Sequence, residues 1–359
     1  MTNKYLQDAK TSGRLTTYST ISAELALLSD QRLSVLLEKS EKVDTSTGVA
    51  MSLNIAGIPV FVKKMCLTDL ERQPENIMST SNLFNLPTYC QYGIAGSVVS
   101  PGFGVWREIA ANAMTTNWVL TGQCLSFPLM YHWRILPRAI PELPTVEKLS
   151  EIERDVEFWE GAVTVRTRLL ANLKASADVV LFLEAIPENL HEWLRKQIVM
   201  GGTVAESACT MVESNLKAIT SFMNSRGLLH FDAHFENILT DGCCLYFADF
   251  GLSISNQFEL SEAELNFFKS NHNYDKCYTM GLLVKWILIE LFGAENYDGI
   301  VREYAAGKGN KILAPEIAKI ITRYSPIAVL RDEFYRNFKE SKTTSYPSSE
   351  LERLLGERS

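Results

Sequence analysis

The feature that most constrains this chain is a pair of short motifs, His-x-Asp-x-x-x-x-Asn and Asp-Phe-Gly. The first contains Asp232 and, five positions later, Asn237; the second begins at Asp249, twelve positions after Asn237. Phosphoryl transfer from ATP needs one carboxylate to orient the attacking hydroxyl, and an amide and a second carboxylate to hold metal ions on the phosphates. Asp232, Asn237 and Asp249 match these needs in chemical type and in order.

Local patterns predict a backbone that would bring these three residues together. Apolar residues at helical spacing predict a helix over residues 212–223, which ends before Gly227. Asp241-Gly242 is typical of a hairpin turn, and apolar strand-like residues lie on both sides of it. This hairpin would place Asp232 and Asp249 on opposite sides of one cleft.

Through these two motifs the chain resembles the protein-kinase-like superfamily. The resemblance implies an α+β protein with a bilobal protein-kinase-like fold, in which a small β-rich N-lobe with helical insertions precedes a larger, mainly helical C-lobe. We expect the N-lobe, with an N-terminal extension, over residues 1–186, and the C-lobe, with a helical C-terminal extension, over 187–359. The resemblance further implies that Asp232 is catalytic and that Asn237 and Asp249 bind Mg²⁺, or alternatively Mn²⁺.

The first motif departs from the pattern of eukaryotic protein kinases at two positions. Phe231 stands where those kinases have an arginine, so a phosphorylated activation loop would lack its usual cationic partner. His234 stands where a lysine is common in Ser/Thr kinases, and Asp-x-His is similar to the loop of aminoglycoside- and choline-kinase-like phosphotransferases. We assign His234 as a catalytic donor to the transferred phosphoryl group; a purely structural donor in the loop is the alternative.

A lysine for the nucleotide phosphates is predicted at the end of a short strand, residues 58–63. Residues 53–55 and the turn at 56–57 would pair with this strand as a hairpin. The Val-x-Val-Lys pattern, similar to the strand that carries the kinase lysine, favours Lys63 over Lys64. Two solvated lysines at a strand end are the alternative interpretation.

The helix glutamate that would hold this lysine is assigned to Glu108. It lies in the helical segment 105–114, which precedes a strand-like run at 127–136, and helix followed by strand is the order that the resemblance requires. Glu71 and Glu75 lie closer in sequence to Lys63, but a proline and a polar stretch nearby are unfavourable for a helix. An ordinary exposed helix glutamate is the alternative for Glu108.

The glycine-rich loop of the resemblance is reduced to a single glycine, Gly48. We expect it between a first strand at residues 33–37 and a second at 49–53, with backbone amides of residues 46–48 binding phosphate oxygens.

An apolar strand at residues 179–186, followed by an amphipathic helix, resembles the hinge between kinase lobes. Adenine is expected to bond the backbone around Glu184 and Ile186. Residues 137–178 carry apolar positions at helical spacing, which predicts a helical insertion before this strand. Asp275, at the start of an apolar helix over residues 274–292, is expected to brace the catalytic loop.

Composition excludes several other classes of function. The net charge of −7 and a pI near 5.5 argue against nucleic acid or an anionic membrane as the main partner. The apolar helix at residues 281–292 carries charges and is too short for a membrane span. Seven cysteines without Cys-x-x-Cys spacing favour free thiols in a reducing compartment, so we expect a cytoplasmic location.

These features predict a kinase that transfers the γ-phosphate of ATP to a hydroxyl group. The favoured acceptor is a protein Ser/Thr hydroxyl, and a small hydroxylated molecule, as in aminoglycoside- and choline-kinase-like enzymes, is the alternative. Two further alternatives stay open: a nucleotide-binding pseudokinase, which the reduced glycine loop favours, and a nucleotidyltransferase.

Overall fold

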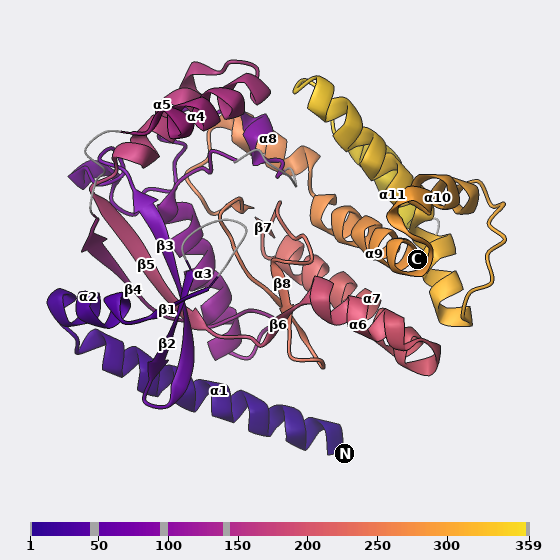
Figure 1. Cartoon of the computed structure of the whole chain (residues 1–359), viewed down its shortest axis with the longest axis horizontal. Coiled ribbons are helices and arrows are strands. Elements are labelled where there is room, and N and C mark those ends of the chain that lie inside the picture. Colours follow the sequence, from indigo (N-terminus) through magenta and orange to yellow (C-terminus); the bar gives the residue numbers. More distant parts are fainter. Residues whose placement is uncertain (1, 44–49, 94–99, 139–143, 357–359) are drawn as a thin grey trace.

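The computed structural model describes residues 2–43, 50–93, 100–138 and 144–356 and belongs to the α+β class (Figure 1). Its largest sheet has five antiparallel strands in the order β1-β2-β3-β5-β4. The strands are β1 (Glu41–Val43), β2 (Ala50–Ile55), β3 (Ile58–Leu67), β4 (Met130–Pro137) and β5 (Ala177–Glu184). We call this sheet and its covering helices the sheet half, and residues 190–356 the helical half; in Figure 1 the sheet lies on the left and most helices of the helical half lie on the right.

The predicted hairpin that carries Lys63 is confirmed. Strands β2 and β3 pair in register from Ala50 opposite Lys63 to Ile55 opposite Ile58. The turn uses left-handed backbone at Ala56 (φ 52°) and at Gly57 (φ 83°), where glycine adopts this conformation without steric cost. Alternation along β3 then fixes the direction of each side chain: Val60 and Val62 face one side of the sheet, and Lys63 faces the other.

Both faces of the sheet are covered by helices. Helix α3 (Val105–Leu120) packs on the face to which Lys63 points, through a buried cluster that includes Trp106, Ile109 and, from β5, Val179 and Leu181. Helices α1 (Thr2–Ala26) and α2 (Asp30–Glu38) contact β4 and β2 respectively, and their apolar residues join Val60 and Val62 in the other buried cluster.

One predicted strand, residues 33–37, is wrong, because this segment is part of helix α2. Leu33 and Leu37 are four positions apart and both buried, which is the spacing of one helix face. The Ser29 side chain accepts a hydrogen bond from Arg32 N and caps the helix. The first strand of the sheet is therefore β1, and the proposed phosphate loop around Gly48 lies outside the described residues.

The remaining predictions of secondary structure differ from the structure mainly at element ends. The predicted insertion at 137–178 contains two helices, α4 (Val146–Phe158) and α5 (Val163–Lys174), and is confirmed as helical. The predicted strands at 127–136 and 179–186 are β4 and β5, so Ile186 lies just beyond β5. The predicted helix at 105–114 is α3, which continues to Leu120.

The helical half packs around the apolar helix α9 (Tyr274–Phe292), which was predicted over the same residues. Its other helices are α6 (Leu190–Met200), α7 (Gly202–Ser225), α8 (Glu262–Ser270), α10 (Tyr297–Ala305), α11 (Pro315–Glu340) and α12 (Ser348–Gly356). Short elements complete the described chain: η1 (Pro74–Asn76), η2 (Thr88–Gln91), η3 (Ala294–Asn296), β6 (Glu188–Asn189), β7 (Leu228–Leu229), β8 (Ile238–Thr240), β9 (Leu245–Phe247) and β10 (Ile254–Ser255). Strands β8 and β9 form the predicted hairpin. The division into two lobes at residue 186 stays a prediction.

Within the described residues, no single helix is both long and apolar enough to cross a membrane. Helix α9 and the following segment Ala294–Ala305 pass the length and composition test only as a pair, bent by 120°.

Glu71 fixes the beginning of helix α3 in the sheet half. One carboxylate oxygen, Oε1, accepts the N–H of Val105, the first residue of α3, at 3.0 Å. The other, Oε2, pairs with Arg168 of α5 at 2.9 Å, and both side chains are almost completely buried. A carboxylate at a helix N-terminus also interacts favourably with the helix dipole. Glu71 is therefore a structural residue that anchors the helix carrying Glu108.

We expect Glu71→Gln to lower the free energy of unfolding by about 3 kcal/mol, because it leaves the buried Arg168 without a charged partner. Urea denaturation at pH 7 measures this change. Glu75→Gln is the matched control, since Glu75 is exposed and should leave the unfolding midpoint unchanged. Equal midpoints for the two variants would contradict the anchoring role of Glu71.

Candidate active site

The site is centred on Lys63, which joins three separate segments of the chain. Its Nζ donates to Glu108 Oε1 of α3 and to Asp249 Oδ1, each at 2.7 Å. The structure thus brings Lys63 to Glu108, the pairing selected from the sequence, and does not bring it to Glu71. The three side chains are between 6% and 23% exposed, so the ammonium group is largely shielded from water.

Burial and charge act in opposite directions on this network. Burial lowers the pKa of Lys63, but the carboxylates of Asp249 and Glu108 outweigh it and raise the pKa well above its usual value. Burial tends to raise the pKa of Asp249, yet Lys63 holds the net pKa below its usual value. For Glu108, burial dominates and its pKa is raised. The ammonium therefore stays protonated and stabilises the charge of Asp249 more than that of Glu108.

Asp232 and Asn237 meet in the loop before β8. Asn237 Nδ2 donates to the backbone oxygen of Asp232 and to its Oδ2, both at 3.0 Å. Burial, followed by the nearby charge of Asp249, raises the pKa of Asp232 to about 8. A carboxyl group with this pKa is mostly protonated at pH 7, and it could take a proton from a hydroxyl only after losing its own.

Two buried side chains fix the shape of this loop. Asp275 of α9 accepts the backbone N–H groups of His230 and Phe231 at 2.6 and 2.9 Å, as the sequence predicted for a bracing residue. These bonds support the left-handed backbone of Phe231 (φ 63°), a conformation that is uncommon for a bulky residue. Burial raises the pKa of Asp275 to about 6, against the lowering effect of the two hydrogen bonds.

His230 connects the loop of Asp232 to the loop of Asp249. Its Nε2 lies 2.9 Å from the backbone oxygen of Ala248, and its Nδ1 accepts from the N–H of Asp232 at 3.3 Å. This pattern requires the neutral ring protonated on Nε2. Burial lowers the pKa of His230 to about 4, so the neutral form persists at physiological pH.

His234 lies beside Asp232, with its Nε2 at 3.8 Å from Asp232 Oδ1. Burial lowers the pKa of His234. The ring is therefore neutral at pH 7, and it would act on a phosphoryl group as a neutral hydrogen-bond donor.

Gly93 brings a second backbone segment against the carboxylate of Asp232. A Cβ atom on Gly93 would lie 2.7 Å from Asp232 Oδ1 and 3.2 Å from a methyl carbon of Leu252. The preceding residues hold this segment in place, because Gln91 Nε2 donates to Leu252 O and Tyr92 Oη donates to Asn271 at 2.8 Å. The long connection between β3 and α3 thus forms one wall of the site.

At the expected hinge, Glu184 is bound by a residue of α1. Arg14 Nε and Nη2 donate to both carboxylate oxygens of Glu184, and Arg14 also donates to the backbone oxygens of Leu125 and Phe127. The N–H of Glu184 donates to Leu129 O at 2.8 Å. Adenine contacts at Glu184 and Ile186 stay predictions.

The donor chemistry of Asn237 and Asp249 fits Mg²⁺, which is commonly held by one or two protein oxygens together with substrate phosphates and water. No group of three His, Cys, Asp or Glu side chains suited to a metal ion is found among the described residues. Asn237 and Asp249 are the residues that would hold such an ion, and this assignment stays a prediction from the sequence.

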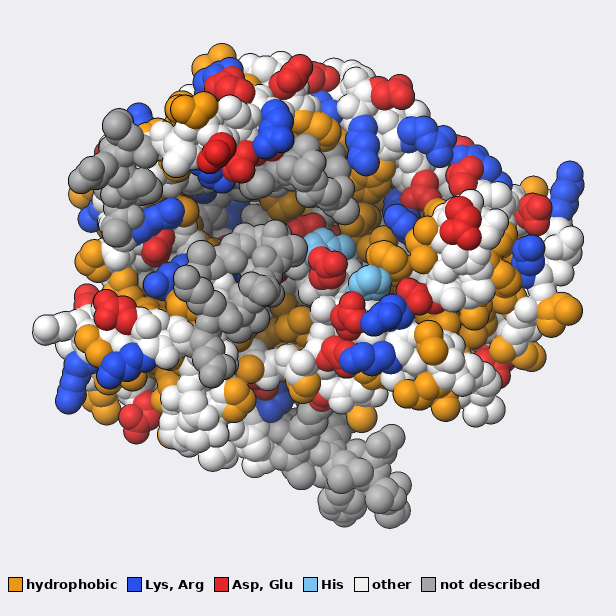
Figure 2. All heavy atoms as spheres, viewed as in Figure 1, with side chains coloured by type: hydrophobic (Ala, Val, Ile, Leu, Met, Phe, Trp, Pro, Cys, Tyr) orange, Lys and Arg blue, Asp and Glu red, His pale blue; other side chains and the backbone are white. Residues whose placement is uncertain are grey.

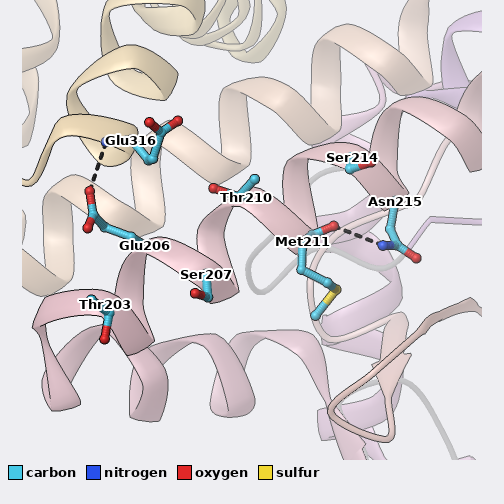
Figure 3. A pocket seen from close by; sticks show the side chains of 8 residues that line it. All are labelled: Thr203, Glu206, Ser207, Thr210, Met211, Ser214, Asn215 and Glu316. Carbon is cyan, nitrogen blue, oxygen red and sulfur yellow. Dashed lines mark hydrogen bonds between the residues drawn. The ribbon is translucent and has the colours of Figure 1, made fainter. Parts of the chain in front are cut away.

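Histidine and acidic side chains lie close together at a hollow on the face shown in Figure 2. A separate groove of about 620 Å³ lies on α7 and the start of α11 (Figure 3). It is lined mainly by small polar side chains, including Ser207, Thr210 and Ser214, with Glu206 and Glu316 at one end. None of the candidate site residues lines this groove, so we do not assign it to the same chemistry.

No protein-family model matches the chain, and the search of curated proteins finds no significant match.

Sequence reasoning did not identify three residues that shape the site: Gly93, Arg14 and Arg107. Arg107 precedes Glu108 and pairs with Glu264 of α8. Each of them contacts a partner more than one hundred positions away, so no local spacing could reveal it.

The pKa of His230 predicts a defined loss of stability in acid. An unfolded histidine takes up a proton near pH 6.5, whereas folded His230 does so only near pH 4, so the unfolded state binds more protons between these values. The stability present above pH 6.5 is then lost as the pH falls, by about 2 kcal/mol between pH 7.5 and 5.

We expect His230→Asn to remove this part of the pH dependence, as measured by urea denaturation at several pH values. His272→Asn is the control, because His272 is a partly exposed histidine outside the site, and it should keep the wild-type dependence. The same acid loss in His230→Asn as in the wild type would show that His230 is not the group responsible.

Proposed function

We propose that this protein is an ATP- and Mg²⁺-dependent phosphotransferase with a kinase-like bilobal fold, which transfers a phosphoryl group to a hydroxyl. The observation that carries the proposal is the buried network in which Lys63 bonds both Glu108 and Asp249. Residues from a strand, a helix and a loop converge there, 45 and 186 positions apart in sequence. Strongly shifted pKa values at such a convergence favour a functional site over a surface ion pair.

Each residue has a role in this proposal. Lys63, with three N–H donors, binds phosphate oxygens while Glu108 fixes its position. Asn237 and Asp249 hold Mg²⁺, which would offset the negative charge of the transferring phosphoryl group. Asp232 orients the acceptor hydroxyl and takes its proton, and its bond from Asn237 keeps it beside the metal site. His230 and Asp275 hold the two loops at a fixed separation.

The acceptor favoured by the sequence is a protein Ser/Thr hydroxyl. A small hydroxylated molecule is the second candidate, and the packing of Gly93 against Asp232 favours it. The segment that precedes Gly93 covers part of the chain after Asp249 through Gln91 and Tyr92, which leaves less room for a polypeptide near the carboxylate. Incubation of the protein with MgATP and either dephosphorylated protein mixtures or pooled alcohols and sugars, followed by mass analysis, distinguishes the two.

We expect Asp232→Asn to lower phosphoryl transfer by about a hundredfold or more, the usual scale for loss of a general base. The same variant should retain the MgATP-induced rise in melting temperature, because Asp232 orients the acceptor and does not bind the metal. Asp298→Asn, an exposed carboxylate on α10, is the matched control and should match the wild type. Equal transfer rates for wild type and Asp232→Asn would refute the catalytic role of Asp232.

Asp249→Asn should lose both the melting shift and the transfer activity, because Asp249 holds the metal and pairs with Lys63. Thermal melting with and without millimolar MgATP, together with the transfer assay, measures both effects. A wild-type protein that shows no melting shift would reject nucleotide binding altogether. A shift without transfer of phosphate or AMP to any acceptor would favour a pseudokinase, whereas transfer of AMP alone would favour a nucleotidyltransferase.

A further inference from the structure

Arg107, the residue before Glu108 on α3, forms a buried ion pair across the molecule. Its Nη2 lies 2.7 Å from Glu264 Oε1 on α8, and the two side chains are only 1% and 3% exposed. Helix α8 belongs to the segment that follows Asp249 in sequence. The pair therefore links the helix that carries Glu108 to the chain segment that leaves the proposed metal site.

Several other contacts surround this ion pair. Arg107 Nε donates to Thr80 O at 2.7 Å, and the guanidinium lies over the rings of Phe103 and Phe258. Glu264 Oε2 accepts the N–H and hydroxyl of Ser261, which closes a capping box at the start of α8. Glu264 is thus held rigidly by its own helix while it binds Arg107.

A second carboxylate, that of Glu259, bonds the same connection through neutral donors. Glu259 Oε2 accepts hydrogen bonds from Ser79, Thr80 and Ser81, in the connection between β3 and α3. We call the residues Arg107, Glu264, Thr80 and Glu259 the clasp. The clasp joins the sheet half to the segment that follows the loop of Asp249, through two carboxylates, those of Glu259 and Glu264.

The other end of α8 rests on the catalytic loop. Phe267 of α8 stacks on Phe231 with ring centroids 5.4 Å apart, and Tyr92 meets the edge of the same ring at 5.9 Å. Phe231 is completely buried and stands where the kinase resemblance has an arginine. In the kinases of the resemblance, an arginine at this position pairs with a phosphorylated residue. Here the buried ring of Phe231 packs against Phe267 of α8 instead, so this contact needs no phosphate.

The energetic cost of burying the Arg107–Glu264 pair indicates that it orients α3 more than it stabilises the fold. Removing Arg107 and Glu264 from water carries a large desolvation cost. Arg107 Nη1 has no hydrogen-bond partner within the part of the chain that the structure describes, which adds to this cost. An apolar pair of similar volume would be at least as favourable for folding, so the ion pair contributes a fixed orientation of α3 more than net stability.

We propose that the Arg107–Glu264 pair is a positioning pair that holds Glu108 against Lys63. The placement of α3 then follows from packing against α8, with no phosphorylated residue required. This inference rests on the proposed function only for its effect on transfer; the placement of Glu108 is measured independently of any activity.

The test is the double variant R107M/E264Q. Glutamine keeps the capping box of α8, and methionine keeps much of the arginine volume, so the charges are removed with little change in packing. A water-soluble carbodiimide couples the Lys63 amine to a contacting carboxyl group as an amide. The water lost in this condensation is taken up by the carbodiimide, which becomes a urea. Peptide mass analysis then measures the Lys63–Glu108 product against the Lys63–Asp249 product, which serves as an internal reference.

We expect the ratio of Lys63–Glu108 to Lys63–Asp249 product to fall about tenfold in R107M/E264Q, and transfer to fall by ten- to a hundredfold, on the order of the cost of a small misplacement. R302M/E333Q is the matched control, since Arg302 and Glu333 form an interhelical ion pair of similar length, 2.8 Å, at the surface. Its ratio should equal that of the wild type.

An unchanged ratio in a cooperatively melting R107M/E264Q protein would overturn the inference. E264Q alone, which keeps a hydrogen-bond acceptor for Arg107, is the milder second variant, and we expect its ratio to fall about threefold. An unchanged ratio in E264Q would equally count against the pair. If the wild-type protein neither binds MgATP nor transfers phosphate, the proposed function is wrong. The ratio of Lys63–Glu108 to Lys63–Asp249 product would still show whether the Arg107–Glu264 pair positions Glu108.

Discussion

The site depends on the ammonium group of Lys63, because it pairs with two carboxylates that the fold buries close together. Glu108 and Asp249 come from a helix and a loop, and without a shared cation their charges would repel. The strand direction of β3 aims Lys63 at α3, and Glu71 anchors the first residue of that helix. The Lys63 side chain therefore links the β2–β3 hairpin to helix α3 and to the loop of Asp249.

The loops around this centre are held by buried polar groups that each serve two segments. His230 bonds the backbone of both loops, and Asp275 accepts two consecutive N–H groups of the loop before β8. Such groups are costly to bury unless every bond is made. These groups fix the backbone on either side of Asp232, at a cost in stability that apolar residues in the same places would not carry.

The sequence predicted best the parts of the site that depend on local pattern. The hairpin before Asp249, the strand of Lys63 and the choice of Glu108 followed from turn signals, alternation and element order. The segment at 33–37 was misassigned, because a short apolar run does not distinguish a buried helix face from a strand. Contacts such as Arg107 with Glu264, 157 positions apart, depend on how packed elements meet, and no local pattern encodes them.

Gly93 lies outside both motifs, yet the residue at this position affects the space around Asp232. Any side chain at this position meets the Asp232 carboxylate or the Leu252 methyl group, within a buried segment that Gln91 and Tyr92 prevent from moving aside. A chain with every motif residue intact but alanine at position 93 would therefore have to move the Asp232 carboxylate or the Leu252 side chain. Position 93 therefore constrains the geometry at Asp232 although it belongs to neither motif.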